Sequence, residues 1–128
     1  MTTALWIGLG GFLGANARYW LALWAADRWG TAFPFGTLMV NGLGSFGLAL
    51  FLTVATGRFI ISPGARLFVV VGFLGGFTTF SAFSLETIGL LGQNRWGPAL
   101  LNVVTNNGLS LLGAVLGIAL ARWLQKGG

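Results

Sequence analysis

Two lines of uncharged polar side chains lie within otherwise apolar segments of this 128-residue chain. The first consists of Thr37, Asn41 and Ser45, and the second of Asn102, Asn106 and Ser110. Because residues four apart share one face of a helix, each set is expected to form a continuous polar stripe. Amide and hydroxyl groups offer hydrogen-bond donors without a fixed charge. Such groups suit an ion that must lose its water without becoming trapped.

The polar stripes also have a purely structural interpretation. Small and hydroxyl residues let membrane helices approach closely, and asparagine side chains hydrogen-bond between helices. For the serine and threonine members both interpretations stay open. For Asn41 and Asn106 we favour a role in lining a pathway, because an uncharged polar residue inside a membrane is a functional candidate by default.

Residues 72–86, with the sequence GFLGGFTTFSAFSLE, are the most unusual segment. Gly75 and Gly76, followed by the β-branched Thr78 and Thr79, disfavour a continuous helix. We therefore expect this span to be broken at its centre. A break frees backbone carbonyl and amide groups, which a membrane protein tolerates only where protein or a polar cavity satisfies them. Broken helices in transporters use such carbonyls to hold Na⁺.

Two phenylalanines beyond the expected break alternate with hydroxyl residues. Phe80 shares a strip with Ser84 and Thr87. Phe83 shares the neighbouring strip with Thr79 and Glu86. The edges of aromatic rings carry partial positive charge, so an anion could pass phenyl edges where it could not pass aliphatic groups. Packing or lipid contact is the ordinary alternative for both phenylalanines.

Two charged residues, Arg18 and Glu86, lie inside predicted spans. Arg18 could attract anions at a vestibule, extend to the membrane surface or pair with Glu86. Glu86 could hydrogen-bond a neighbouring helix or act as a proton-coupling carboxylate.

The composition indicates which elements must position these residues. Hydrophobic residues make up 55% of the chain and charged residues 7%, whereas a soluble domain has about a quarter charged. Histidine and cysteine are absent from the sequence, so the usual zinc, haem and cysteine–histidine sites are excluded and an enzyme is not expected. The basic residues are scattered, so no nucleic-acid partner is expected.

We predict an all-α membrane protein with four transmembrane helices, forming a single domain over residues 1–128. A spanning helix needs roughly 20 apolar residues. The stretches that meet this need are 4–26, 38–56, 67–91 and 99–120. Glycine pairs spaced by four residues are expected where these helices touch. These pairs are Gly10/Gly14, Gly72/Gly76 and Gly113/Gly117.

The distribution of charge suggests how the protomers assemble. With four spans, both termini and the second connection share one side of the membrane. That side carries Arg58, Arg66, Arg122 and Lys126, and the opposite side carries Arg28 and Arg95. The difference in the number of Lys and Arg residues between the two sides is small, so it permits insertion in both orientations. Antiparallel dimers follow naturally from dual insertion, and a protomer this small could not enclose a pathway alone.

Three strings of residues are specific enough to indicate a family. They are Gly11-x-x-Gly14-Ala15-x-x-Arg18-Tyr19, Phe35-Gly36-Thr37-Leu38-x-Val40-Asn41 and Gly72-Phe73-x-Gly75-Gly76-x-Thr78-Thr79-Phe80-Ser81-x-Phe83-Ser84-x-Glu86. Together they resemble the Fluc (CrcB) fluoride channels. The resemblance implies an antiparallel dual-topology homodimer in the cell (inner) membrane of a microbe. It also implies two fluoride pores and passive, selective export of F⁻ from the cytoplasm.

The resemblance further implies roles for individual residues. Phe80 and Phe83 correspond to the family's pore phenylalanines, Asn41 to its pore asparagine and Arg18 to its vestibule-side arginine. The family's polar track would be supplied here by Thr79, Ser81, Asn106 and Ser110.

The family's central cation site corresponds to the backbone carbonyls of Gly75 and Thr78. The resemblance implies that they hold one structural, non-transported Na⁺ between the two subunits. The chain departs from the family at Asn102 and Asn106, where relatives have hydroxyl or ring-bearing residues.

Two other functions stay open. A small proton-coupled exporter is also commonly a four-span, dual-topology dimer, and its single essential carboxylate would be Glu86. A membrane scaffold without transport would leave the two polar stripes unexplained.

Overall fold

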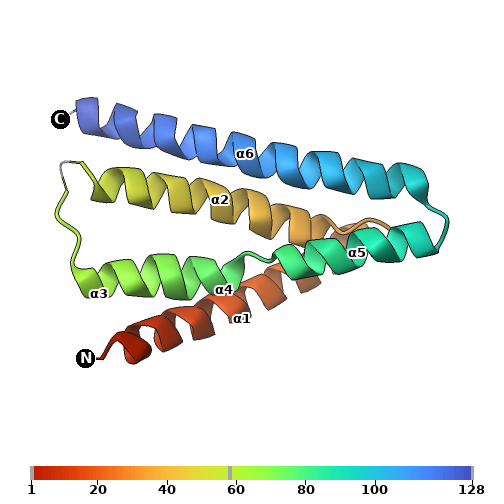
Figure 1. The fold of residues 1–128 in the computed structure, drawn as a ribbon, viewed down its shortest axis with the longest axis horizontal. Coiled ribbons are helices and arrows are strands. Elements are labelled where there is room, and N and C mark those ends of the chain that lie inside the picture. Colours follow the sequence, from red (N-terminus) through yellow and green to blue (C-terminus); the bar gives the residue numbers. More distant parts are fainter. Residues whose placement is uncertain (1, 58, 128) are drawn as a thin grey trace.

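The computed structural model describes residues 2–57 and 59–127. Its elements are the helices α1 (Thr3–Trp29), α2 (Phe35–Ala55) and α3 (Pro63–Arg66), the π-helix η1 (Leu67–Leu74), and the helices α4 (Gly75–Phe77), α5 (Phe80–Gly92) and α6 (Trp96–Lys126) (Figure 1). No strand occurs within the described ranges, which confirms the all-α class. Arg58, counted in the charge distribution, lies outside the described residues.

Three segments are long and apolar enough to cross a membrane: α2, the run Pro63–Gly92 and α6. They correspond to the predicted spans 38–56, 67–91 and 99–120. The remaining helix, α1, has 27 residues and is about 40 Å long at 1.5 Å per residue, so its length suffices. Asn16, Arg18 and its tryptophans make it less apolar than the others. The span 4–26 therefore stays a prediction.

The long helices lie roughly alongside one another (Figure 1). Helix α2 packs along α6, and α1 packs against η1 and α4. Both termini and the connection between α2 and α3 lie at one end of the molecule, and the other two long connections lie at the opposite end. This is the arrangement expected for an even number of passes.

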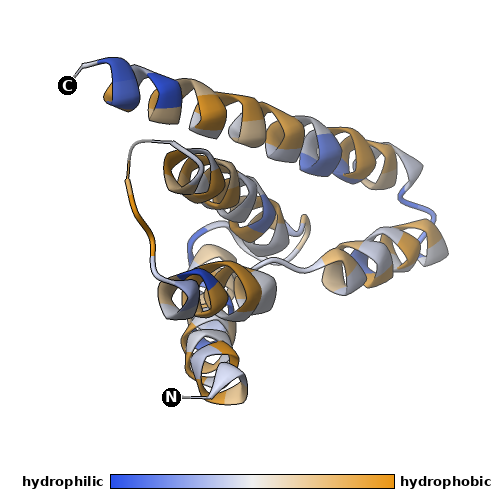
Figure 2. Ribbon diagram, turned by 60° about the vertical axis from the view of Figure 1, so that its left-hand side comes forward, coloured by the Kyte–Doolittle hydropathy of each residue, from blue (hydrophilic) through white to orange (hydrophobic). Residues whose placement is uncertain are grey.

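Large apolar side chains cover much of the surface. Phe12, Leu85 and Leu111 are 66%, 74% and 70% exposed. Figure 2 shows hydrophobic turns along the helices, and a hydrophilic stretch inside α6 between hydrophobic turns on both sides. A soluble monomer rarely exposes so much contiguous apolar surface, so these faces suit lipid.

Glycines allow the closest helix contacts. A Cβ atom at Gly10 or Gly14 would overlap the backbone oxygen of Phe68 or Phe73 on the third span, and one at Gly117 would overlap Phe46 O on α2. The predicted glycine pairs at helix contacts are therefore confirmed for α1 and α6.

The third span is interrupted at Thr78 and Thr79. Both residues are extended, with φ −82° and ψ 153° at Thr78 and φ −152° and ψ 114° at Thr79. The predicted break is confirmed. It falls on the two β-branched threonines, which fit an extended backbone, whereas Gly75 and Gly76 remain helical in α4. The π-helix η1 that precedes it was not predicted from the sequence.

Candidate functional site

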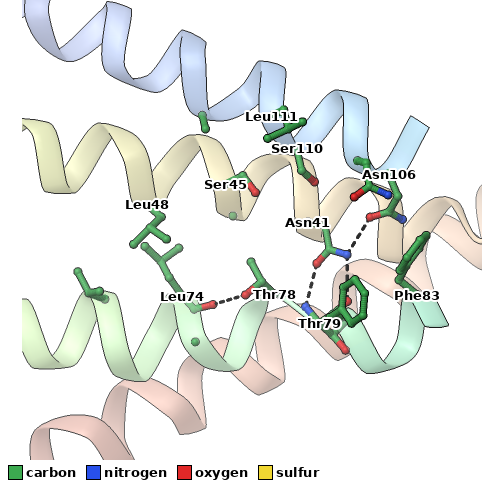
Figure 3. A pocket seen from close by; sticks show the side chains of 16 residues that line it. Asn41, Ser45, Leu48, Leu74, Thr78, Thr79, Phe83, Asn106, Ser110 and Leu111 are labelled. Atoms are coloured by element: carbon green, nitrogen blue, oxygen red, sulfur yellow. Dashed lines mark hydrogen bonds between the residues drawn. The ribbon is translucent and has the colours of Figure 1, made fainter. Parts of the chain in front are cut away.

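A pocket of about 470 Å³ lies between α2, α6 and the broken third span (Figure 3). It gathers predicted pore residues from three separate segments, namely Asn41, Thr79, Phe80, Phe83, Asn106 and Ser110. Gly75 and Thr78, predicted to offer backbone carbonyls, also line it. Two other predicted site residues, Arg18 and Ser81, do not line this pocket. The Ser81 hydroxyl instead lies 3.3 Å from Thr79 Oγ1.

Asn41 bonds the backbone at the break. Its Oδ1 accepts the Thr79 N–H at 2.8 Å, and its Nδ2 donates to Thr79 O at 3.0 Å. The same Nδ2 donates to Asn106 Oδ1 at 3.0 Å, as Figure 3 shows. The amide of Asn41 therefore ties α2 both to the interrupted span and to α6.

The break leaves two carbonyl groups without their helical donors. In a continuous α-helix the Thr79 N–H would bond Gly75 O, and the Ala82 N–H would bond Thr78 O. Thr79 N–H instead bonds Asn41, and Ala82 N–H donates to Thr79 Oγ1 at 3.1 Å. Both carbonyls are thus released from these bonds at the residues where the sequence predicted cation ligands.

The chemistry of these oxygens fits a hard cation such as Na⁺, which prefers oxygen ligands over nitrogen or sulfur. In the part of the chain that the structure describes, no group of three or more His, Cys, Asp or Glu side chains could hold a metal. Backbone carbonyls at the break are therefore the candidate ligands.

The α6 stripe divides into two environments. Asn106 and Ser110 line the pocket, whereas Asn102 is fully buried and donates to Thr87 Oγ1 on α5 at 2.9 Å. Asn106 Nδ2 reaches Asn102 Oδ1 at 3.4 Å, so the two asparagines are linked. The α2 stripe divides as well, because Asn41 and Ser45 line the pocket and Thr37 does not.

The two pore candidates Phe80 and Phe83 are close but differently exposed. Their ring centroids lie 5.4 Å apart with an interplanar angle of 53°. Phe83 is 7% exposed, whereas Phe80 is 74% exposed. One ring is therefore packed within the protomer, and the other borders the pocket at the protein surface.

A second pocket of about 240 Å³ contains Glu86 and Thr37, near the connection between α1 and α2. Thr37 Oγ1 donates to Glu86 Oε1 at 2.6 Å. The other oxygen, Oε2, is buried and has no hydrogen-bond partner among the described residues. Glu86 thus lies outside the pocket that holds the other candidates.

Arg18 donates from Nε to Gly76 O at 3.2 Å, in the turn before the break. Within the protomer, the alternative in which Arg18 pairs with Glu86 is wrong, because Glu86 Oε1 bonds Thr37 and Oε2 has no partner among the described residues. A carbonyl near a helix end suits a guanidinium donor. The vestibule role of Arg18 stays a prediction.

Asn107 lines the pocket beside Asn106 and was not singled out from the sequence. Thr87 was expected on one strip with Phe80 and Ser84, but the bond that it accepts from buried Asn102 was not predicted. The apolar residues of the pocket include Leu48, Val70 and Leu111. Nothing in their type distinguishes them in the sequence from residues that face lipid.

Comparison with known proteins shows the family to which the chain belongs. The family described as CrcB-like protein, Camphor Resistance (CrcB) matches residues 5–118. A fluoride-specific ion channel FluC of Roseiflexus sp. (strain RS-1) is 49% identical over 92% of this chain and 95% of its own length. Proteins with the same name from Chloroflexus aurantiacus (strain ATCC 29366 / DSM 635 / J-10-fl) and Legionella pneumophila (strain Paris) are 45% and 42% identical, over 96% and 94% of this chain and 98% and 90% of their own. These matches confirm the resemblance found in the three sequence strings, and the chain therefore belongs to the CrcB family, which comprises ion channels and not enzymes.

Proposed function

We propose that this protein is a fluoride-specific channel that passively exports F⁻ from the cytoplasm across the cell (inner) membrane. The names of its relatives support the choice of ion. The observation that carries the proposal is an uncharged, donor-rich pocket at the break of a membrane helix. Its polar side chains come from α2 and α6 and include Asn41, Ser45, Asn106 and Ser110. Both N–H bonds of Asn41 are engaged by Thr79 O and Asn106 Oδ1, so the donors open to an ion are those of the other three.

The chemistry of the pocket suits fluoride. This anion is small and strongly hydrated, so a selective path must replace its water with several weak donors. Amide and hydroxyl groups can do so, and the edges of the Phe80 and Phe83 rings add partial positive charge. Because the pocket lining contains no charged side chain, nothing in it would trap the ion.

A second, oppositely oriented copy would complete the path. Polar groups facing hydrocarbon are costly, so a polar pocket at a protomer surface calls for a cover. Phe80 borders this pocket and is 74% exposed, which leaves its ring available to a partner. We therefore place an antiparallel dual-topology homodimer across this face, with phenylalanines from both copies lining each pore.

A structural Na⁺ is the proposed occupant of the site formed by the Gly75 and Thr78 carbonyls. Their loss of helical donors supports this assignment. When bound, the ion would supply a fixed positive charge beside the break. The residues themselves contribute backbone oxygens, and Asn41 takes the Thr79 N–H that would bond Gly75 O in a continuous helix.

The alternative function is proton-coupled export through Glu86. One observation favours it: Glu86 Oε2 is buried and finds no hydrogen-bond partner within residues 2–57 and 59–127, as a carboxyl that exchanges protons would be. The exporter would need Glu86 for every transport cycle, whereas the channel would not.

Fluoride efflux from proteoliposomes tests the proposal. Vesicles loaded with KF are diluted into fluoride-free buffer, and valinomycin releases the counter-charge while an electrode follows F⁻. We expect rapid F⁻ efflux, negligible Cl⁻ efflux and a loss of activity when the protein is prepared without Na⁺. Protein-containing vesicles that retain F⁻ as empty vesicles do would overturn the channel function.

Orientation can be tested separately because the chain has no cysteine. A single cysteine replacing a residue at one end of α6 should be labelled from both sides of the membrane by an impermeant maleimide. Labelling from one side alone would contradict the antiparallel dimer while leaving the efflux result intact.

A further inference from the structure

A chain of hydrogen-bonded amides runs from the break to α5. It begins at the Thr79 N–H, which donates to Asn41 Oδ1 at 2.8 Å. Asn41 Nδ2 donates to Asn106 Oδ1 at 3.0 Å, and Asn106 Nδ2 donates to Asn102 Oδ1 at 3.4 Å. Asn102 Nδ2 then donates to Thr87 Oγ1 at 2.9 Å. Three side-chain amides thus point the same way along one line.

The first end of the chain has a fixed direction. A backbone N–H can donate but never accept, so Asn41 must present its oxygen to Thr79. Its nitrogen then faces the opposite way. Both N–H bonds of that nitrogen are used, one by Thr79 O and the other by Asn106 Oδ1.

The other end is fixed as well. A hydroxyl has a single hydrogen, and Thr87 gives it to Phe83 O at 2.8 Å. While Thr87 makes this bond, its Oγ1 accepts from Asn102, which presents its nitrogen there and its oxygen to Asn106. Asn102 is fully buried and Thr87 is 8% exposed, so water cannot readily replace either bond.

Asn106, held between these two ends, has a single favourable orientation. If its amide were reversed, its nitrogen would face Asn41 Nδ2 and its oxygen would face Asn102 Oδ1, two like pairs in a buried setting. In the observed orientation its oxygen is engaged, and one N–H points to Asn102. The second N–H of Asn106 is not bonded to any described residue, and Asn106 lines the 470 Å³ pocket.

We infer that Thr87 and Asn102 are positioning residues for anion passage: together with Asn41, they hold the hydrogen-bonded amides in the direction in which Asn106 offers an N–H, rather than an oxygen, to the pocket. This inference rests on the proposed channel function. Neither residue lines the pocket, so each acts through Asn106. A donor stabilises an anion and a carbonyl oxygen repels it. The hydrogen-bonded row of amides therefore suits an anion, because it presents a donor to the pocket.

The hydroxyl of Thr87 is the sharpest point to test. Thr87→Val keeps the shape but removes the acceptor that fixes Asn102, so we expect F⁻ efflux to slow by about tenfold. Thr87→Ser keeps the hydroxyl and should stay within about twofold of wild type. Thr105→Val is the matched control, because the Thr105 hydroxyl bonds Leu101 O in its own helix, as Thr87 bonds Phe83 O. It should conduct as wild type does.

Asn102→Leu tests the next link. We expect about a tenfold loss of efflux in the single variant, and no further loss when Thr87→Val is added, because both changes break one chain. Equal efflux in wild type and Thr87→Val would overturn the inference, as would fully additive losses. If Asn102→Leu does not fold, the comparison between Thr87→Val and Thr87→Ser still decides.

A spectroscopic measurement separates this inference from the channel function. Solid-state NMR of the ¹⁵N-labelled side-chain amides should show Asn102 and Asn106 resonances moved in Thr87→Val and nearly unmoved in Thr87→Ser. If the wild-type protein transports no F⁻, the proposed function fails. The resonances alone then report whether the row of hydrogen-bonded amides exists. Unmoved resonances in Thr87→Val would overturn the inference whatever the flux.

Discussion

The amide of Asn41 bonds both the N–H and the carbonyl oxygen of Thr79, at 2.8 Å and 3.0 Å. A single side chain on α2 therefore replaces the helical acceptor that the Thr79 N–H lacks at the break, and it also bonds the Thr79 carbonyl. In a membrane, unsatisfied backbone groups cost several kcal/mol each, by order of magnitude. The break in the third span is thus stabilised by a tertiary contact and not by solvent.

The first prediction concerns this contact. Asn41→Leu removes the bonds to Thr79 and to Asn106 and leaves a buried N–H unpaired. We expect F⁻ efflux to fall by at least about tenfold. Asn16→Leu is the matched control, because Asn16 is exposed and its Nδ2 bonds Phe12 O in its own helix. Wild-type efflux in Asn41→Leu vesicles would contradict the role of Asn41.

The second prediction concerns the exposed ring at the pocket. Phe80→Ile replaces an aromatic edge with an aliphatic group that has no comparable partial positive charge, so F⁻ efflux should fall by about tenfold or more. The protomer should still fold, because this ring is 74% exposed. Phe12→Ile provides the comparison, since Phe12 is 66% exposed on α1 and does not line the pocket. Similar efflux losses in both variants would indicate a general effect of removing surface rings.

Much of this site was predictable from residue types and spacing. The helical period placed Asn41 beside Ser45 and Asn106 beside Ser110, and both pairs line the pocket. The β-branched Thr78 and Thr79 indicated the break. These signals depend on a single segment, so they can be interpreted without knowing how the neighbouring helices pack.

Other features depended on tertiary packing. Thr37 continues the α2 stripe in sequence, yet it bonds Glu86 in another pocket because α5 approaches α2 there. A helix turns 100° per residue, so four steps do not return to the same direction, and a stripe drifts around its axis. The contact of Arg18 with Gly76 O was likewise invisible in the sequence, since it joins residues 58 apart.

The third prediction tests the helix contact beneath the break. Gly14→Ala places a Cβ onto Phe73 O and should destabilise the fold by about 1–3 kcal/mol, which thermal unfolding in detergent would detect. At Gly8 a Cβ would meet nothing within 4 Å. Gly8→Ala should therefore be neutral, or stabilising by up to about 1 kcal/mol through its better helix propensity. Equal melting temperatures for the two variants would contradict the close packing of α1 on the third span.

The fourth prediction separates a channel from a proton-coupled exporter. In the wild-type protein the Thr37 hydroxyl donates to Glu86 Oε1 at 2.6 Å, and Glu86→Gln keeps an oxygen that can accept this bond. The other oxygen, Oε2, which has no partner among the described residues, is replaced by an amide nitrogen. The substitution removes the proton-exchanging group with little change in volume. Because Glu86 lies outside the pocket that contains Asn41 and Phe80, we expect passive F⁻ efflux to persist, within about tenfold of wild type.

An exporter would behave differently, because a carboxylate that carries the coupled proton cannot be replaced by an amide. Efflux should therefore be measured in vesicles with and without an imposed pH gradient, for wild type and for Glu86→Gln. A channel gives F⁻ movement that follows its own electrochemical gradient in both proteins. Wild-type transport driven uphill by the pH gradient, together with its complete loss in Glu86→Gln, would instead assign the carboxylate to proton coupling and reverse the order of the two functions.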